Sequence, residues 1–167
     1  MIEPKLYTDF KHHIKDELFL FPYSCHGVKH AKRVLWLAAV IAENYNLTES
    51  EKRILGYACC FHDVGRINDY TDLSHGRLSA EKALQLNLLN DTISKRDIDT
   101  ILMLITYHSV DDQWFVGNER ECLLYKILKD ADALDRVRFG DDLDINYIRL
   151  DVSKTMIDTA KELFEKL

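Results

Sequence analysis

Hydrophobic positions recur every three or four residues over almost the whole chain, and this spacing predicts amphipathic α-helices. The first predicted helix follows Pro4, buries a stripe from Leu6 to Phe21, and stops near Pro22, because proline cannot continue a helix. Further helices are predicted over residues 26–45, 48–65, 79–89, 94–108, 119–133 and 153–167, and the helix from 119 is expected to continue past Leu134. Residues 140–150 have no single period and are left unassigned.

Polar residues mark where two of these helices begin. Thr48 and Glu51 have the spacing of a capping box, and Ser94 with Asp97 offers a second cap. The chain has only six glycines and two prolines, too few for a turn-rich β architecture, and no strand–helix alternation. We therefore expect an all-α fold, a single-domain helical bundle of about six to seven helices over residues 1–167.

Composition narrows the functional classes. A net charge of −6 argues against a nucleic-acid partner, which a basic face would attract. The four cysteines form no CxxC pair and no secreted disulfide framework. The N-terminal segment has no apolar signal core, and no apolar run is long enough to cross a membrane. The expected location is the cytoplasm, with no membrane association.

Five of the seven histidines fall at predicted helix ends or on apolar helix faces: His26, His30, His62, His75 and His108. Each one alone is more often a hydrogen-bonded core residue than a ligand. As a group they favour metal binding, because imidazole and carboxylate together suit Mn, Fe, Co, Ni or Zn. The remaining pair, His12 and His13, is interpreted as surface.

Carboxylates accompany these histidines. Asp63 follows His62 at a predicted helix end, and Asp132 shares a helix face with Leu128. A carboxylate on an apolar face is costly to bury unless it is paired, hydrogen-bonded or bound to a metal. Asp130 and Asp135 are interpreted as a solvated acidic face.

Taken together, these residues resemble the HD-domain metal-dependent phosphohydrolase superfamily. The signature is a histidine, a His-Asp pair and a distant aspartate, here His30 in HAKRV, His62-Asp63 in CCFHDVGR and Asp132 in DADALD. The resemblance covers about residues 22–140, with the helix at 153–167 beyond it. It implies an HD-domain fold in which these four residues are metal ligands.

Some branches of the superfamily place two more histidines between the His-Asp pair and the last aspartate. His75 and His108 stand where those branches place theirs, as in bacterial dinucleoside-tetraphosphate hydrolases and cyclic-di-nucleotide phosphodiesterases. The resemblance thus implies two divalent metal ions, bridged by Asp63. The longer motif of the cyclic-di-nucleotide branch is absent from the chain, so that substrate is not assigned.

The implied reaction is hydrolysis of a small phosphorylated substrate, such as a nucleotide, by metal-activated water. Asp63, Arg66 and His26 are the residues expected in catalysis: Arg66 to hold phosphate, and His26 as a general acid, a phosphate contact or a structural residue at the helix end. Asp69 and Asp135 could orient neighbouring groups. Weaker phosphate candidates are Arg77, Lys29 and Arg136, of which Lys29 and Arg77 are better interpreted as solvated charges.

Two other functions stay open. A few HD-domain proteins use a di-iron pair for oxygen-dependent bond cleavage with the same ligand set, and a non-catalytic nucleotide-binding module could keep the fold. Trp114 and Phe115 could stack on a base or anchor their loop. The metal, the substrate and the oligomeric state are not determined by the sequence.

Overall fold

The computed structural model describes residues 1–89, 92–140 and 143–167, and the regular structure in these residues is helical throughout. The α-helices are α1 (Lys5–Phe10), α2 (Val28–Ala42), α3 (Glu49–Phe61), α4 (His75–Gln85), α5 (Lys95–Tyr107), α6 (Glu119–Leu134), α7 (Asp151–Lys154) and α8 (Ile157–Lys166). Short 3-10 turns occupy Lys11–His13, Asp16–Leu18, Asp112–Trp114, Asp135–Phe139 and Ile145–Tyr147. The all-α prediction is confirmed.

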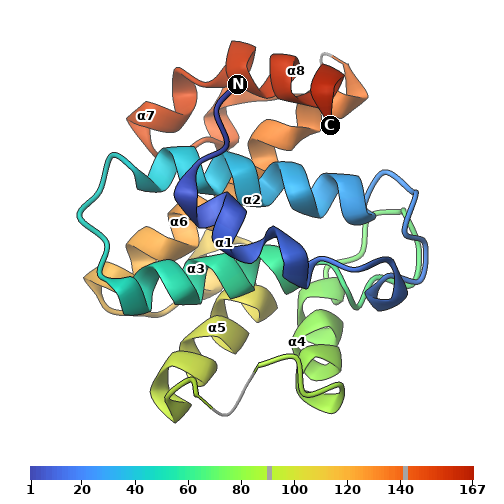
Figure 1. The fold of residues 1–167 in the computed structure, drawn as a ribbon, viewed down its shortest axis with the longest axis vertical. Helices are drawn as coiled ribbons and strands as arrows, with labels where there is room; N and C mark the ends of the chain where they lie inside the picture. The colour runs from blue at the N-terminus through green and yellow to red at the C-terminus, as the bar shows by residue number, and fades with distance from the viewer. Residues whose placement is uncertain (90–91, 141–142) are drawn as a thin grey trace.

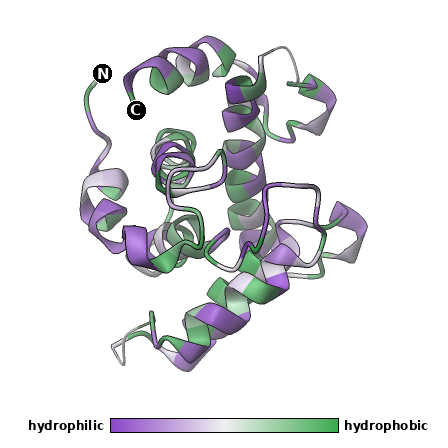
Figure 2. Ribbon diagram, turned by 90° about the vertical axis from the view of Figure 1, so that its right-hand side faces the viewer, coloured by the Kyte–Doolittle hydropathy of each residue, from purple (hydrophilic) through white to green (hydrophobic). Residues whose placement is uncertain are grey.

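The core is built around α2, in which nearly every side chain is buried. This helix packs against α1, α3 and α6, while α5 packs against both α3 and α4 (Figure 1). Hydrophobic and hydrophilic residues alternate along the same helices (Figure 2), as amphipathic helices require. Among the described residues, no helix combines the length and the apolar character needed to cross a bilayer.

Both predicted helix caps are present. The Thr48 side chain accepts a hydrogen bond from the Glu51 backbone, and the Glu51 carboxylate accepts one from the Thr48 backbone at 2.7 Å. The Ser94 hydroxyl accepts from the Asp97 backbone at 3.1 Å. These local signals were readable because a cap depends only on residues three apart in the chain.

The first and last helices differ from the sequence prediction. The first helix ends at Phe10 rather than near Pro22, because the backbone is extended at Ile14, and Ile14 and Leu18 reach the core through short turns. The segment 153–167 divides into α7 and α8, since the chain leaves the helix at Thr155 and Met156 and buries the Met156 side chain. A four-residue spacing of apolar positions is shared by long helices and by broken ones, so it could not reveal these breaks.

Smaller differences concern helix ends. The helix predicted at 79–89 begins four residues earlier, at His75, and ends at Gln85. The unassigned stretch 140–150 contains the 3-10 turn Ile145–Tyr147, while residues 141–142 lie outside the described part of the chain.

Candidate metal centre

The residues predicted as ligands come from five helices and meet in one place. They lie within α2, at the ends of α3 and α5, at the start of α4 and within α6: His30, His62, Asp63, His108, His75 and Asp132. Five of them are buried, whereas the Asp132 side chain is one-third exposed. Asp132 is therefore the most exposed of the six.

Asp63 stands at the centre of this cluster, with one carboxylate oxygen facing each of two histidine pairs. Its Oδ2 atom lies 3.4 Å from His30 Nε2 and 3.8 Å from His62 Nε2. Its Oδ1 atom lies 3.2 Å from His75 Nε2 and 3.5 Å from His108 Nε2. Asp132 Oδ1 joins the first pair, at 3.3 Å from His30 Nε2. A single carboxylate thus connects two sets of donor atoms.

Each of the four histidines is held by its other ring nitrogen. His62 Nδ1 donates to the Cys59 carbonyl at 2.8 Å, His108 Nδ1 donates to the Ile105 carbonyl at 2.7 Å, and His75 Nδ1 donates to the Asp72 carbonyl. His30 Nδ1 donates to the Asp135 carboxylate at 2.7 Å. Because a carbonyl oxygen can only accept, Nδ1 carries the proton and Nε2 of a neutral ring presents a lone pair to Asp63.

This arrangement fits divalent metal ions. The Nε2 atoms face each other at 3.1 Å in the His30–His62 pair and at 2.9 Å in the His75–His108 pair. Two lone pairs at that distance repel unless a cation or a proton lies between them. Asp63 Oδ1 is buried and accepts no hydrogen bond from the described residues. The groups His30–His62–Asp63 and Asp63–His75–His108 could each hold one ion.

The pKa values of these groups agree with a ligand role. Burial lowers the pKa of His62 to about 3 and that of His75 to about 4, so both are neutral at physiological pH, the form that binds metal. Burial also acts to lower the pKa of His30, but the hydrogen bonds that its ring donates to the carboxylates of Asp132, Asp135 and Asp63 outweigh it and raise the value to about 10. At His30, a metal ion would take the place of a proton.

Two glycines allow the ligand-bearing helices to approach closely. A β-carbon at Gly65 would come within 2.2 Å of the Ser79 backbone nitrogen in α4, and one at Gly76 within 2.6 Å of the Ile105 and Thr106 carbonyl oxygens in α5. Gly65 follows Asp63 by two residues, and Gly76 follows His75 directly. The absence of side chains there sets the spacing among α3, α4 and α5, and with it the distances among the ligands.

The interpretation of Asp130 and Asp135 as a solvated acidic face was wrong, because both are buried, whereas the other role considered for Asp135, to orient a neighbouring group, agrees with its contact to His30. Asp130 is fully buried and accepts hydrogen bonds from the Arg149 and Leu150 backbones at 2.9 and 2.8 Å. Asp135 is 1% exposed and accepts from Arg33 Nε at 2.5 Å as well as from His30. Helix periodicity alone could not place them, because their partners come from distant segments.

Arg138 is a functional candidate that sequence reasoning missed. Its side chain is 5% exposed and donates to Asp135 Oδ2 at 3.2 Å. Its Nε atom has no hydrogen-bond partner among the described residues, and its charge acts to lower the pKa of His30. The sequence offered one sign of this contact: Arg138 follows Asp135 by three residues, about one helical turn.

Arg66 lies at the centre, as expected, but it contacts a ligand. Its Nε is 2.9 Å from Asp63 Oδ2, its Nη1 donates to the Tyr70 carbonyl at 3.2 Å, and its Nη2 is 3.4 Å from His75 Nε2. The side chain is 13% exposed, so the guanidinium is a largely buried cation beside the carboxylate that joins the two sites. The weaker phosphate candidates, Lys29, Arg77 and Arg136, are exposed.

His26 lies next to the cluster without joining it. Its ring centroid is 5.7 Å from that of His30, and its Nδ1 is 3.2 Å from Asp69 Oδ1. Ser24 also donates to Asp69 Oδ1, at 2.9 Å. Cys25, His26 and Asp69 form a further group of close donor atoms, but burial raises the pKa of the Cys25 thiol, which disfavours the thiolate that metals bind.

A narrow cleft joins His26 to Asp63 and Arg66. Trp114 and Phe115, which the sequence offered as residues that stack on a base or anchor their loop, do not line this cleft. Phe115 stacks on Tyr125 at a centroid distance of 4.0 Å and anchors the loop, while Trp114 is exposed.

Comparison with known proteins identifies a family that this chain matches. A family model described as the HD domain matches residues 27–137, about two-thirds of the chain and all six predicted ligands. Neither the curated proteins nor the solved structures searched gave a match. On the strength of the family match, the chain belongs to the HD domain family.

Proposed function

We propose that this protein is a metal-dependent phosphohydrolase that acts on a nucleotide or another small phosphate ester. The observation that carries the proposal is the convergence of four histidine Nε2 atoms on Asp63, whose two oxygens face two separate donor sets. HD domains are generally metal-dependent hydrolases, which supports the same reading. Burial raises the pKa values of the Cys59 and Cys60 thiols, so neither is a competing nucleophile.

Divalent ions bound there would lower the pKa of a water molecule and neutralise charge on the phosphoryl group. The protein's own groups supply the remaining functions. Arg66 and Arg138 keep positive charge beside the carboxylates, which favours an anionic substrate over a neutral one. His26 lies beside the centre with Nδ1 3.2 Å from Asp69 Oδ1; in its protonated form it would carry a proton on Nε2 that it could donate to a leaving oxygen, with Asp69 balancing the charge of the ring.

Exposed apolar side chains surround the entrance and favour a substrate with a flat or apolar part. The cleft beside Asp63 and Arg66 is lined by Leu20 and Phe21, and the Phe139 ring lies 6.2 Å from that of His26. These three exposed side chains, Leu20, Phe21 and Phe139, are called the rim. Exposed apolar groups gathered around a polar site are typical of ligand binding.

The test begins with the protein purified without a histidine tag. Its metals are counted by elemental analysis, and the same sample is assayed without oxygen against nucleotides and phosphate esters. About two metals per chain with phosphate release would support the proposal. Bound iron with turnover only after oxygen is admitted would replace it with the oxygenase function, and no metal and no turnover after metal is added back would overturn both.

Single substitutions test the assignment of ligands to two sites. His75→Ala and His108→Ala should each lose about one metal per chain and keep the other, because the His30–His62–Asp63 group remains. His12→Ala, a change at an exposed histidine, is the matched control and should keep both. Retention of two metals in both site variants would show that these histidines are not ligands.

A further inference from the structure

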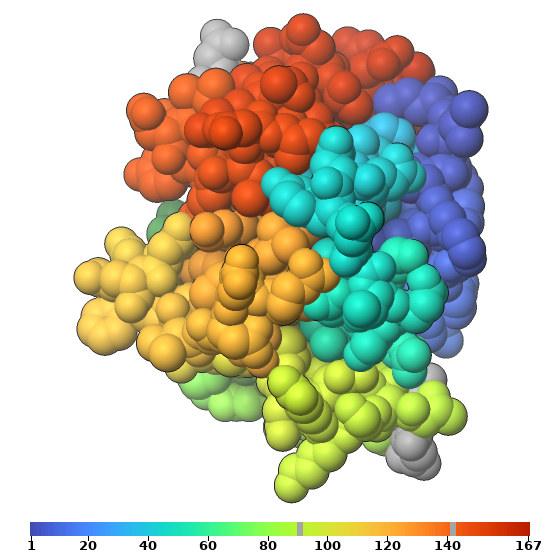
Figure 3. Space-filling model, turned by 90° about the vertical axis from the view of Figure 1, so that its left-hand side faces the viewer, coloured from blue at the N-terminus to red at the C-terminus, as the bar shows by residue number. Residues whose placement is uncertain are grey.

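A sizeable cavity lies away from the candidate metal centre. It has a volume of about 560 Å³, is partly open to solvent, and is lined mainly by α1, the end of α2, the turn that follows it, and α3 as far as Tyr57. Figure 3 shows the N-terminal segment in blue beside the cyan and teal segment that joins α2 to α3, which is the side of the molecule concerned. None of the six candidate ligands lines this cavity. Its volume is in the range of small-molecule sites, roughly 300–1,000 Å³.

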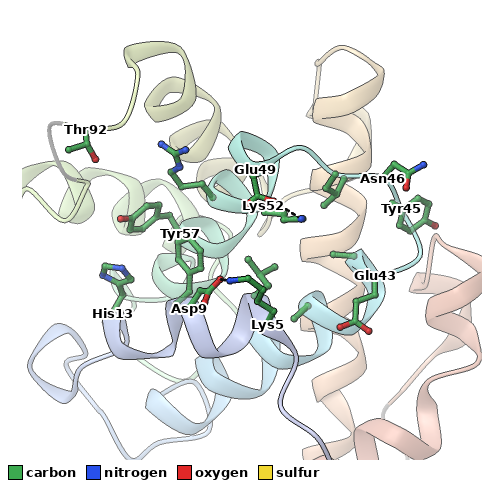
Figure 4. A pocket seen from close by; sticks show the side chains of 16 residues that line it. Lys5, Asp9, His13, Glu43, Tyr45, Asn46, Glu49, Lys52, Tyr57 and Thr92 are labelled. Atoms are coloured by element: carbon green, nitrogen blue, oxygen red, sulfur yellow. Dashed lines mark hydrogen bonds and ion pairs between the residues drawn. The ribbon is translucent and has the colours of Figure 1, made fainter.

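One end of the cavity is aromatic. Phe10 meets Tyr57 edge to face at a centroid distance of 5.1 Å, and His13 lies 4.9 Å from Tyr57. Figure 4 shows His13 and Tyr57 together at one end, with Glu43, Tyr45 and Asn46 at the other. Burial lowers the pKa of His13, so its ring is neutral at physiological pH. Such a wall favours a flat ring, which can pack edge to face or offset against it.

The charges that line the cavity are mostly paired within their own helices. Lys5 pairs with Asp9 at 2.6 Å, and Lys52 pairs with Glu49 at 2.7 Å; both pairs are drawn as dashed lines in Figure 4. Glu43 has no such pair, but it is exposed and solvated. None of these groups therefore offers an unpaired, partly buried charge to a ligand; that charge comes from a residue at the aromatic end.

That residue is Arg53. It lines the cavity, is half-buried, and makes no hydrogen bond or ion pair with the described residues. Arg53 and Tyr57 lie four residues apart in α3, one helical turn, and both line the cavity, so the arginine stands beside the aromatic wall. A partly desolvated guanidinium without a counter-ion favours a carboxylate, sulfonate or phosphate group, which it can bind through two N–H donors.

We infer that this cavity binds a small aromatic anion, with the ring against His13, Phe10 and Tyr57 and the acidic group on Arg53. The site is separate from the proposed phosphohydrolase centre and does not depend on its activity. The α3 helix forms a wall of the cavity with Tyr57 and ends at the centre with His62, so both sites share one rigid element.

Two fluorescent probes of the same shape test the inference on the full-length, metal-loaded protein. One is 8-anilinonaphthalene-1-sulfonate, and the other is N-phenyl-1-naphthylamine, its neutral counterpart. The sulfonate should bind saturably, one per chain. Arg53→Gln should weaken it by about tenfold, the scale of a lost charge-assisted hydrogen bond, and leave the neutral probe unchanged. Arg77→Gln removes the same charge from an exposed site on α4 and should have no effect.

Two further variants locate the bound probe. Ala42→Trp places an indole in the cavity and should abolish binding of both probes, with folding checked by thermal melting. Phe21→Ser changes the rim of the metal centre and should leave binding intact. The inference is overturned by the absence of saturable binding, by equal sulfonate affinity in Arg53→Gln and wild type, or by loss of binding in Phe21→Ser. If Ala42→Trp does not fold, the comparison of sulfonate affinity between Arg53→Gln and Arg77→Gln still tests whether the sulfonate binds at Arg53.

Discussion

Asp135 shows how one residue connects the core to the metal centre. Its two oxygens accept from Arg33, His30 and Arg138, and it is almost completely buried. The guanidinium of Arg33 is 4% exposed and depends on this carboxylate for its counter-charge. The same carboxylate holds the His30 ring with Nε2 towards Asp63, so folding and ligand geometry rest on one side chain.

Asp135→Ala is therefore expected to affect stability and metal binding together. Leaving the Arg33 charge buried without a partner should lower the free energy of unfolding by about 3–5 kcal/mol. The affinity for the metal at His30 should fall by roughly 10–100-fold, because the ring loses its orienting partner. Denaturant unfolding and metal titration measure the two effects.

Asp158→Ala, an exposed substitution on α8, is the control and should change neither quantity. Asp135→Asn, which keeps an acceptor oxygen, should recover part of the metal affinity. Wild-type metal affinity in Asp135→Ala would refute the positioning role.

At the scale of elements, the centre depends on how closely α3, α4 and α5 approach. Gly65 and Gly76 lie where a side chain would strike backbone atoms of the neighbouring helix. Backbone cannot move aside as the end of a long side chain can, so the helices must separate to admit a methyl group. His75 and His108 come from the two helices that Gly76 holds together.

Gly76→Ala tests this spacing. We expect the free energy of unfolding to fall by about 1–3 kcal/mol and the metal at Asp63, His75 and His108 to be lost first. Elemental analysis of the purified variant gives the readout. Gly117→Ala, whose added carbon meets the Phe115 and Glu121 side chains, should keep the wild-type metal content. If Gly76→Ala also keeps it, the close approach does not control the site.

The first turns of α3 and α6 are joined by an ion pair that should appear in the pH dependence of stability. The Glu51 carboxylate accepts from Arg120 at 2.6 and 2.7 Å. Hydrogen bonding to Arg120 is the main cause that lowers the pKa of Glu51 from 4.5 to about 2, and the Thr48 backbone adds to it. The folded state thus binds this proton less readily than the unfolded chain.

The stabilisation is therefore complete above pH 4.5 and is lost as the pH falls towards 2. Arg120 is nearly half-exposed, so solvent screening limits the effect to at most about 1 kcal/mol. Glu51→Gln should flatten the stability profile over this interval in denaturant unfolding at several pH values. Glu165→Gln, at an exposed position in α8, should keep the wild-type slope. Identical slopes in wild type and Glu51→Gln would contradict the expectation.

At the scale of the whole molecule, the centre lies where five helices meet, so a bound metal should stabilise the entire fold. A ligand at a thousand times its Kd adds about 4 kcal/mol to the free energy of unfolding. Dialysis against a chelator should lower the thermal midpoint, and added Mn²⁺ should restore it, as followed by circular dichroism. His62→Ala should respond much less to either treatment. Equal midpoints with and without metal would show that the folded state gains nothing from the ions.

The sequence by itself determined the class of fold and picked out the six candidate ligands that the structure brings together. Helical spacing, the Thr48 and Ser94 caps, and the His30, His62-Asp63 and Asp132 pattern are all local in the chain or fixed by order along it. Such signals can be recognised in the sequence alone because a helix and its caps involve residues three or four apart. The family match agrees with them.

Only the tertiary structure decided which polar groups are buried and what they contact. Asp130 and Asp135 looked like surface carboxylates, yet their partners Arg149 and Arg33 lie 19 and 102 residues away. The breaks after Phe10 and at Met156, and the cavity beside Arg53, depend likewise on how helices pack against each other. A periodic pattern reports which face of a helix is apolar, whereas burial of a charge depends on the partner that the fold brings to it.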